Sequence, residues 1–203
     1  MLISFEARDR EVIETQRSDL QGLLAQSSVS SRKPCGNCGS ASATGSACGC
    51  GLDWSRLARQ LSSDPERFPI EAGILPLVFA LSEVPALSPC WSCEGHLDAE
   101  GRLHRLPSVW FTCHALAYPS LLAEALAALS AKRVLKHTWQ VAAVHCGSQF
   151  EPVFAIEPRI DAGDVSLSGL HADILALAAN LRDRMHSLAA AHIARLDARL
   201  LAA

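Results

Sequence analysis

The stretch CWSCEGHLDAEGRLHRLPSVWF, residues 90–111, places cysteine, histidine and tryptophan side chains on both sides of a turn. Its centre, DAEG at residues 98–101, is typical turn chemistry and separates two short extended pieces. LPSVWFTC, residues 106–113, alternates and is rich in aromatic and β-branched side chains, which favours a strand. The stretch therefore predicts a β-hairpin at the beginning of the main folded unit.

Helical and extended patterns alternate after this hairpin. Tyr118-Pro119 opens a predicted helix, because proline suits the first helical position and leucines follow at helical spacing. Residues 137–146 and 150–158 are predicted strands, and one long helix is predicted from Ser168 onward. The apolar stripe of this helix consists of Leu170, Ile174, Leu177, Leu181, Met185 and Leu188. The β-α-β-β-α order predicts an α+β fold with a small antiparallel or mixed sheet and helices on one face.

The sequence before the hairpin divides into smaller parts. Residues 5–26 carry apolar side chains at helical spacing among charges, which predicts a helix. A serine-rich linker follows, and residues 35–51 hold too few large apolar side chains to build a core. Asp53 is a suitable N-cap for a short helix that bears Trp54, Leu57 and Leu61. The expected parts are a helix with linker at 1–33, a cysteine-rich zinc-knuckle segment with a short helix at 34–62, and an α+β domain at 63–203.

Composition excludes several classes of protein. Apolar residues make up 49% of the 203 residues, which suits a packed core and excludes a fully disordered chain. The net charge of −3 gives no general attraction to nucleic acid or to anionic membranes. The sequence reaches a charge at Glu6 without an apolar signal region, and its most apolar stretch, residues 70–81, is too short to span a bilayer. We expect a soluble cytoplasmic protein, in which clustered cysteines bind metal more often than they form disulfides.

The first cysteine cluster has the pattern Cys-x2-Cys-x9-Cys-x-Cys and consists of Cys35, Cys38, Cys48 and Cys50. Glycines beside these cysteines let backbone amides turn toward the thiolates, and tetrahedral zinc accepts four sulfur ligands. Over about sixteen residues the segment resembles a zinc ribbon or zinc knuckle, although its second cysteine pair is more closely spaced than usual. Because the segment has no core of its own, we expect a structural zinc ion to order it.

The second cluster is Cys90-x2-Cys93-x2-His96, which offers three zinc ligands within a short stretch. The fourth ligand is open, and the candidates within reach across the hairpin are Cys113, His104 and His114. In another arrangement Cys90 and Cys93 join Cys35 and Cys38 in a single shared site. We therefore expect one or two zinc ions per chain.

PCWSC, residues 89–93, is similar to the Pro-Cys-x-x-Cys motif of the zinc nucleoside and base deaminases. Those enzymes also carry a His-x-Glu or Cys-x-Glu motif upstream, whose glutamate transfers the proton. Glu71 and Glu83 have no histidine or cysteine two residues before them, so this catalytic half is missing. A thioredoxin-like role of Cys90 and Cys93 requires a helix after the first cysteine, whereas EGHLDAEG predicts a turn.

Two functions follow from these patterns. The first is a zinc-stabilised binding or adaptor protein, of bacterial type by its alanine- and leucine-rich composition, in which zinc is mainly structural. The alternative is a zinc-dependent hydrolase-type enzyme, in which Cys90, Cys93 and His96 leave one position open to water and Glu94 acts as the base. The sequence does not decide whether the protein is an enzyme.

The last helix carries two further expectations. Residues 189–203 are expected to project and to pack against another chain, either a protein partner or a second copy. His171, His186 and His192 are expected at the surface or at the edge of the apolar stripe. On the predicted strand at residues 106–113, Cys113 is expected to be a core thiol.

Overall fold

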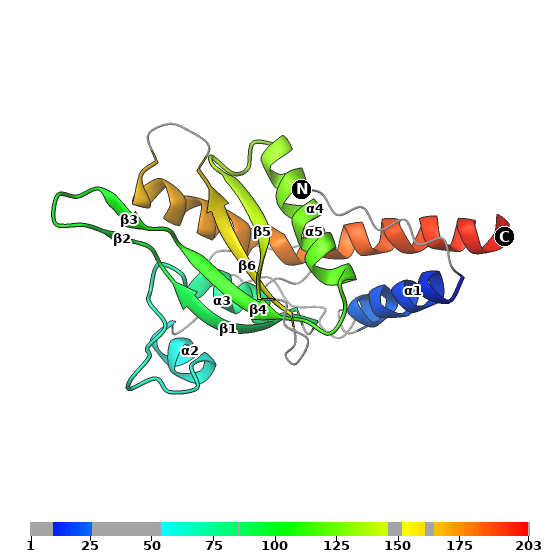
Figure 1. Cartoon of the computed structure of the whole chain (residues 1–203), viewed down its shortest axis with the longest axis horizontal. Helices are drawn as coiled ribbons and strands as arrows, with labels where there is room; N and C mark the ends of the chain where they lie inside the picture. Colours follow the sequence, from blue (N-terminus) through cyan, green and yellow to red (C-terminus); the bar gives the residue numbers. More distant parts are fainter. Residues whose placement is uncertain (1–9, 26–53, 85, 146–151, 161–164, 203) are drawn as a thin grey trace, which may run out of the picture.

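The fold consists of a four-stranded sheet, a two-stranded sheet and surrounding helices, as the computed structural model of the chain shows (Figure 1). The structure describes residues 10–25, 54–84, 86–145, 152–160 and 165–202. The helices are α1 (Arg10–Ala25), α2 (Trp54–Leu61), α3 (Leu75–Ser82), α4 (Ala117–Ala131) and α5 (Leu167–Ala202). The strands are β1 (Ser88–Cys93), β2 (His96–Leu97), β3 (Leu103–Arg105), β4 (Ser108–Thr112), β5 (Thr138–His145) and β6 (Val153–Arg159).

The predicted hairpin is present and is longer than the sequence pattern indicated. β1 pairs with β4 and β2 pairs with β3, both antiparallel, so one extended hairpin runs through both sheets. At its tip the Gly101 N–H donates to the Asp98 carbonyl oxygen at 3.0 Å. The Asp98 carboxylate accepts the backbone N–H of Arg102, which lowers the pKa of that carboxyl group. Local turn chemistry thus fixes this part of the fold.

The four-stranded sheet has the order β1-β4-β6-β5, and all of its neighbouring strands are antiparallel. The predicted α+β class with a small antiparallel sheet is confirmed. The sequence pattern did not predict β1 as a strand of this sheet or α3 as a helix. Helix α3 buries most of its residues and carries apolar side chains on all sides, so its sequence has no polar face that would reveal the helical period.

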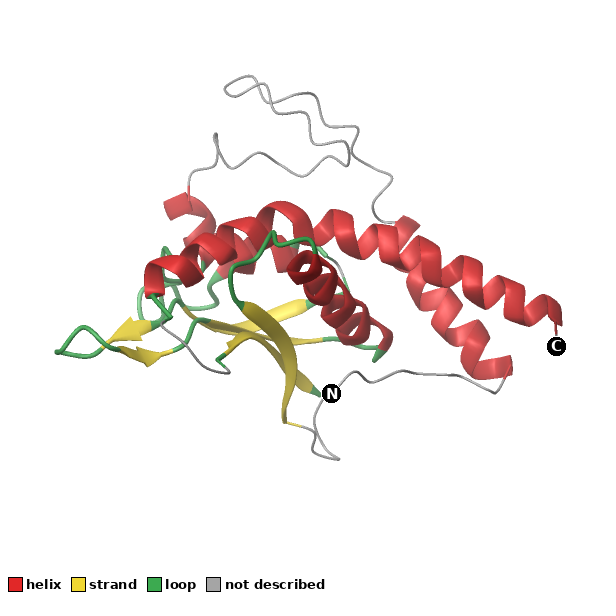
Figure 2. Cartoon of the chain, turned by 90° about the horizontal axis from the view of Figure 1, so that it is seen from above, coloured by secondary structure: helices red, strands yellow, loops and turns green. Residues whose placement is uncertain are grey.

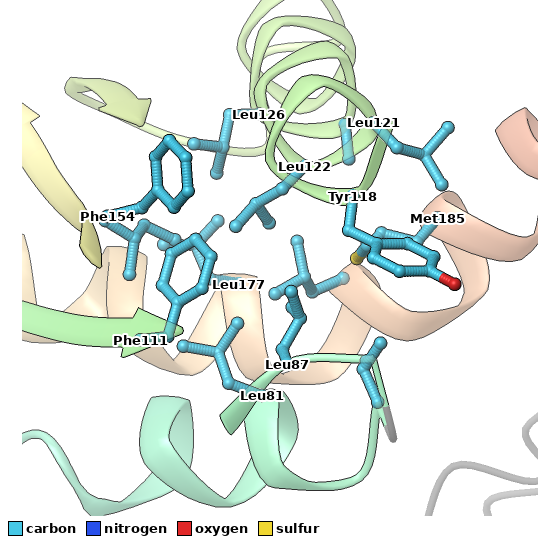
Figure 3. Close-up of a cluster of buried hydrophobic side chains, with 14 of the residues drawn as sticks. Leu81, Leu87, Phe111, Tyr118, Leu121, Leu122, Leu126, Phe154, Leu177 and Met185 are labelled. Atoms are coloured by element: carbon cyan, nitrogen blue, oxygen red, sulfur yellow. The ribbon is translucent and has the colours of Figure 1, made fainter. Parts of the chain in front are cut away.

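The core lies between the sheet and the helices α3, α4 and α5, which Figure 2 shows on one side of the strands. Phe111 of β4 and Phe154 of β6 stack with their ring centroids 5.9 Å apart. Leucines of α4 and α5, including Leu122 and Leu177, pack over these rings (Figure 3). Five residues of the predicted stripe of α5 have no exposed surface, whereas the sixth, Leu188, is partly buried; the five are Leu170, Ile174, Leu177, Leu181 and Met185.

The start of α5 is held by a buried carboxylate. Asp173 is 1% exposed, and its oxygens accept the backbone N–H groups of Lys136 at 2.8 Å and His137 at 2.9 Å. The His137 imidazole at 2.8 Å and the Trp139 indole N–H at 3.2 Å complete the set of donors. Because a buried carboxylate without partners is strongly unfavourable, these four contacts fix α5 against the segment between α4 and β5.

Helix α1 packs along the C-terminal half of α5 in the same chain (Figure 1). Ile13, Leu20 and Leu23 of α1 are buried, and the Arg17 guanidinium pairs with the Asp197 carboxylate of α5. The end of α5, which was expected to project and to pack against another chain, thus has a neighbouring helix in its own chain, and the contact with another chain stays a prediction. The contact with α1 was not predicted, because both helices carry only a few large apolar residues on this face. Among the described residues, no helix combines the length and the apolar character needed to cross a bilayer.

Replacing Asp173 by asparagine tests the buried carboxylate. The variant places an amide N–H₂ against groups that are themselves donors, so we expect the free energy of unfolding to fall by about 3 kcal/mol. Chemical denaturation measures this change. Asp197→Asn on the same helix is the control, because its half-exposed pair with Arg17 is worth less than about 1 kcal/mol. Equal losses in the two variants would contradict the role assigned to Asp173.

Truncation after Leu188 tests the contact between α1 and α5. It removes the buried residues Ala189 and Leu196, so we expect α1 to become sensitive to proteases. The free energy of unfolding is expected to fall by ~1.5–3 kcal/mol for each leucine or isoleucine that becomes exposed. Limited proteolysis and thermal unfolding measure both effects, and light scattering follows the oligomeric state. A truncated chain with unchanged stability and a smaller assembly would instead assign residues 189–203 to another chain.

Candidate metal centre

Three potential metal ligands meet at the edge of the sheet. Their ligand atoms belong to Glu71, Cys93 and His96 and all lie within 4.8 Å of one another. Glu71 precedes α3, Cys93 ends β1 and His96 begins β2. We call these three residues the metal group. They combine a carboxylate, a thiol and an imidazole, which are the three ligand types that zinc accepts in proteins.

The turn between β1 and β2 brings Cys93 and His96 together. Gly95 has a φ of +88°, a backbone conformation that residues with side chains rarely adopt. A Cβ atom at Gly95 would also lie 2.9 Å from the Leu167 side chain and 2.9 Å from that of Pro107. The Gly95 N–H points at the Cys93 Sγ at 3.5 Å. Gly95 therefore closes the turn and also contacts the Cys93 sulfur.

The carboxylate of Glu71 is oriented by the same turn. The Glu94 N–H donates to Glu71 Oε2 at 2.7 Å, which leaves Glu71 Oε1 at 3.2 Å from His96 Nε2. Glu94 is fixed in turn, because its Oε2 accepts the Gly73 N–H at 2.7 Å. One oxygen of Glu71 is thus held by the backbone, and the other faces the imidazole.

The dimensions of the metal group fit a zinc ion. Tetrahedral zinc with bonds of about 2.0–2.3 Å separates its ligand atoms by about 3.3–3.7 Å. Glu71 Oε1 and His96 Nε2 already have about that spacing, and Cys93 Sγ has to approach by at most about 1 Å. Cys93 is 2% exposed, whereas the side chains of Glu71 and His96 are 34% and 43% exposed. An ion can therefore reach the metal group from the solvent side.

Other residues that the sequence offered as ligands lie elsewhere. Cys90 is exposed at an irregularity of β1, and partial burial raises the pKa of its thiol. Cys113 is buried in the core, as expected. His104 is exposed on β3, and His114 lies against the Tyr118 ring. In the described part of the chain, only the metal group places three such ligands together.

Two residues of this site escaped the sequence analysis. Glu71 was considered only as a glutamate without the upstream histidine or cysteine of the deaminases, and its isolation within the apolar stretch 70–81 was the signal available for it. His171, expected at the surface or stripe edge, is half-buried and contacts Glu94. The first cysteine cluster, Cys35, Cys38, Cys48 and Cys50, lies outside the described residues.

A small cavity lies apart from the metal group, between α1 and the start of α4. Its volume is about 150 Å³, and its lining residues are Ser18, Asp19, Gly22, Leu23, Ala86, His114 and Tyr118. The Tyr118 hydroxyl donates to the Asp19 carbonyl oxygen at 3.0 Å. Burial, followed by the Asp19 charge, raises the pKa of Tyr118 to about 12, so the hydroxyl keeps its proton and fastens α1 to α4.

Comparisons of the chain with models of protein families, with curated proteins and with solved structures find no match. Support for a function therefore comes from the residues of the metal group and their surroundings.

Cys90 and Cys93 provide a matched pair of variants, because they lie three residues apart on one strand. We expect Cys93→Ser to lower the zinc content by one ion per chain, since it removes a ligand of the metal group. Cys90→Ser is expected to leave the zinc content unchanged. Elemental analysis of the purified variants measures both. Loss of an ion in Cys90→Ser with retention in Cys93→Ser would contradict the assignment of ligands.

Proposed function

We propose that this is a zinc-binding protein in which one ion is held by Glu71, Cys93 and His96 and acts mainly as a structural cross-link. The observation that carries the proposal is the convergence of three ligand atoms within 4.8 Å. Glu71 lies before helix α3 in the sequence, and Cys93 and His96 lie after it. The N–H···S contact from Gly95 adds support, because it fixes the position of the Cys93 sulfur at the turn.

The cross-link fixes an edge of the fold. β1 is an edge strand of the four-stranded sheet, and Glu71 precedes the buried helix α3. A metal ion between them stabilises the folded state, because the three ligands come together only there and the free energy of binding adds to that of folding. Zinc bound here therefore stabilises the position of α3 against β1.

A second zinc ion is assigned to Cys35, Cys38, Cys48 and Cys50, whose pattern resembles a zinc ribbon or knuckle. The arrangement in which Cys90 and Cys93 share one ion with Cys35 and Cys38 is revised here, since Cys90 is exposed and lies apart from the metal group: Cys35 or Cys38 would instead supply the fourth ligand of that group. Both arrangements agree with one or two zinc ions per chain. The site then has four protein ligands, as structural zinc sites do.

The second candidate is a zinc-dependent hydrolase-type enzyme. The number of ligands favours it, because the described residues supply three and catalytic zinc sites keep one position for water. The base that the sequence suggested, Glu94, already accepts the Gly73 N–H with Oε2. Its backbone groups hold Glu71 and His171. Because these three contacts give Glu94 a structural role in the turn, we rank the structural function of zinc first.

A binding or adaptor role accompanies the structural zinc. The described surface exposes large apolar side chains, including Leu201 at 90% and Leu175 at 60%, both on α5. We propose that α5 binds a protein partner or a second copy of the chain through the part of its surface that α1 leaves uncovered.

Exogenous ligands separate the two candidate functions. We expect purified protein to carry one or two zinc ions, and its Co²⁺-substituted form to keep its visible spectrum when azide or acetohydroxamate is added. A site closed by four protein ligands has no position for these molecules. Zinc removal by a chelator should lower the melting temperature, as scanning calorimetry measures. A spectral shift with azide would favour the enzyme, and protein that is stable and binds no zinc would refute both functions.

A further inference from the structure

His171 connects the metal group to the long helix. Its Nε2 lies 2.9 Å from the Glu94 carbonyl oxygen, 77 residues away in sequence. A carbonyl oxygen only accepts hydrogen bonds, so Nε2 carries the proton and donates. The ring is half-buried and lies close to Gly73, where an added Cβ would come within 2.7 Å of His171 Cε1. The imidazole is therefore packed into the loop that carries Glu71.

Glu94 transmits this contact to the ligands. Its carbonyl oxygen accepts from His171, its N–H donates to Glu71 Oε2, and its carboxylate accepts from Gly73. A shift of Glu94 would move the Glu71 carboxylate away from His96. Helix α5 therefore affects the metal group through one residue that itself binds no metal.

The first turns of α5 make a second contact with the site and are also hydrogen-bonded to the segment that leads into β5. The Leu167 side chain packs so closely on Gly95 that a Cβ there would lie 2.9 Å away. On the other side, Asp173 ties the helix to His137 and Trp139. The turn that carries His171 is thus held between the metal group and the sheet.

We infer that His171 is a positioning residue for the metal group, and that metal binding and the packing of the first turns of α5 strengthen each other through Glu94. This inference rests on the proposed zinc function. Coupling between two sites is reciprocal, so a zinc ion bound by the metal group also stabilises this part of α5. Residues that orient metal ligands through hydrogen bonds are typically worth a factor of about 10–100 in metal affinity.

Variants of His171 test the first half of the inference. The relevant ion is the one that Cys93→Ser removes, and its affinity is measured by competition with a chelator. We expect His171→Ala to weaken that affinity by up to about 10-fold, the lower end of this range, because the imidazole acts on Glu71 only through Glu94. His171→Gln should recover part of it, because its side-chain amide can donate to the Glu94 carbonyl oxygen. The control is His192→Ala, which removes another half-buried histidine from the same helix and its contact with Glu124 at 2.8 Å.

Hydrogen exchange of the unaltered protein tests the second half and needs no variant. We expect zinc to slow the exchange of amides at residues 170–175 more than of those near His192. If the unaltered protein binds no zinc through Cys93, the proposed function fails and the inference fails with it. If it binds zinc but His171→Ala has unchanged affinity, or if zinc leaves the exchange of residues 170–175 unaltered, the inference alone is overturned.

Discussion

The arrangement of the long helix α5 and the sheet depends on the hydrogen bonds that the Asp173 carboxylate accepts. It accepts hydrogen bonds from the segment that leads from α4 into β5, so one side chain sets where α5 lies. Because His171 stands two residues earlier, the same turn of α5 also contacts the link between β1 and β2. β1 and β5 are the two edges of the four-stranded sheet. The first turns of α5 thus connect both edges, and the metal group lies at one of them.

Local patterns predicted those parts of the fold whose causes lie within a few residues. The hairpin follows from the turn at residues 98–101, and α4 and α5 follow from their helical periodicity. The role of Asp173 has no local signal, because its donors lie 34 to 37 residues away and two of them are backbone amides. Helix α3 was missed because a segment buried on all sides has no polar face to reveal its period.

Sequence patterns predicted Cys93 and His96 of the candidate site but not Glu71, again because distant parts of the chain meet there. Cys90 lies at the irregularity of β1 and is exposed, whereas Cys93 at the end of the strand is buried. A Cys-x-x-Cys pair holds one ion when the chain turns between the two cysteines. Here the turn comes after Cys93, at Gly95, and therefore pairs Cys93 with His96. Glu71 enters from a segment before α3, and sequence spacing alone contains no information about that approach.

The hydrogen bonds around the metal group support the proposed structural role rather than the catalytic one. A catalytic base takes a proton from bound water with an oxygen of its carboxylate. Oε2 of Glu94 accepts the Gly73 N–H, and one Glu71 oxygen accepts the Glu94 N–H. The other Glu71 oxygen faces His96, where it would serve as a ligand in the proposed site. The polar groups at this edge of the sheet therefore hold chain segments together, and a metal ion bound among them adds one more connection of the same kind.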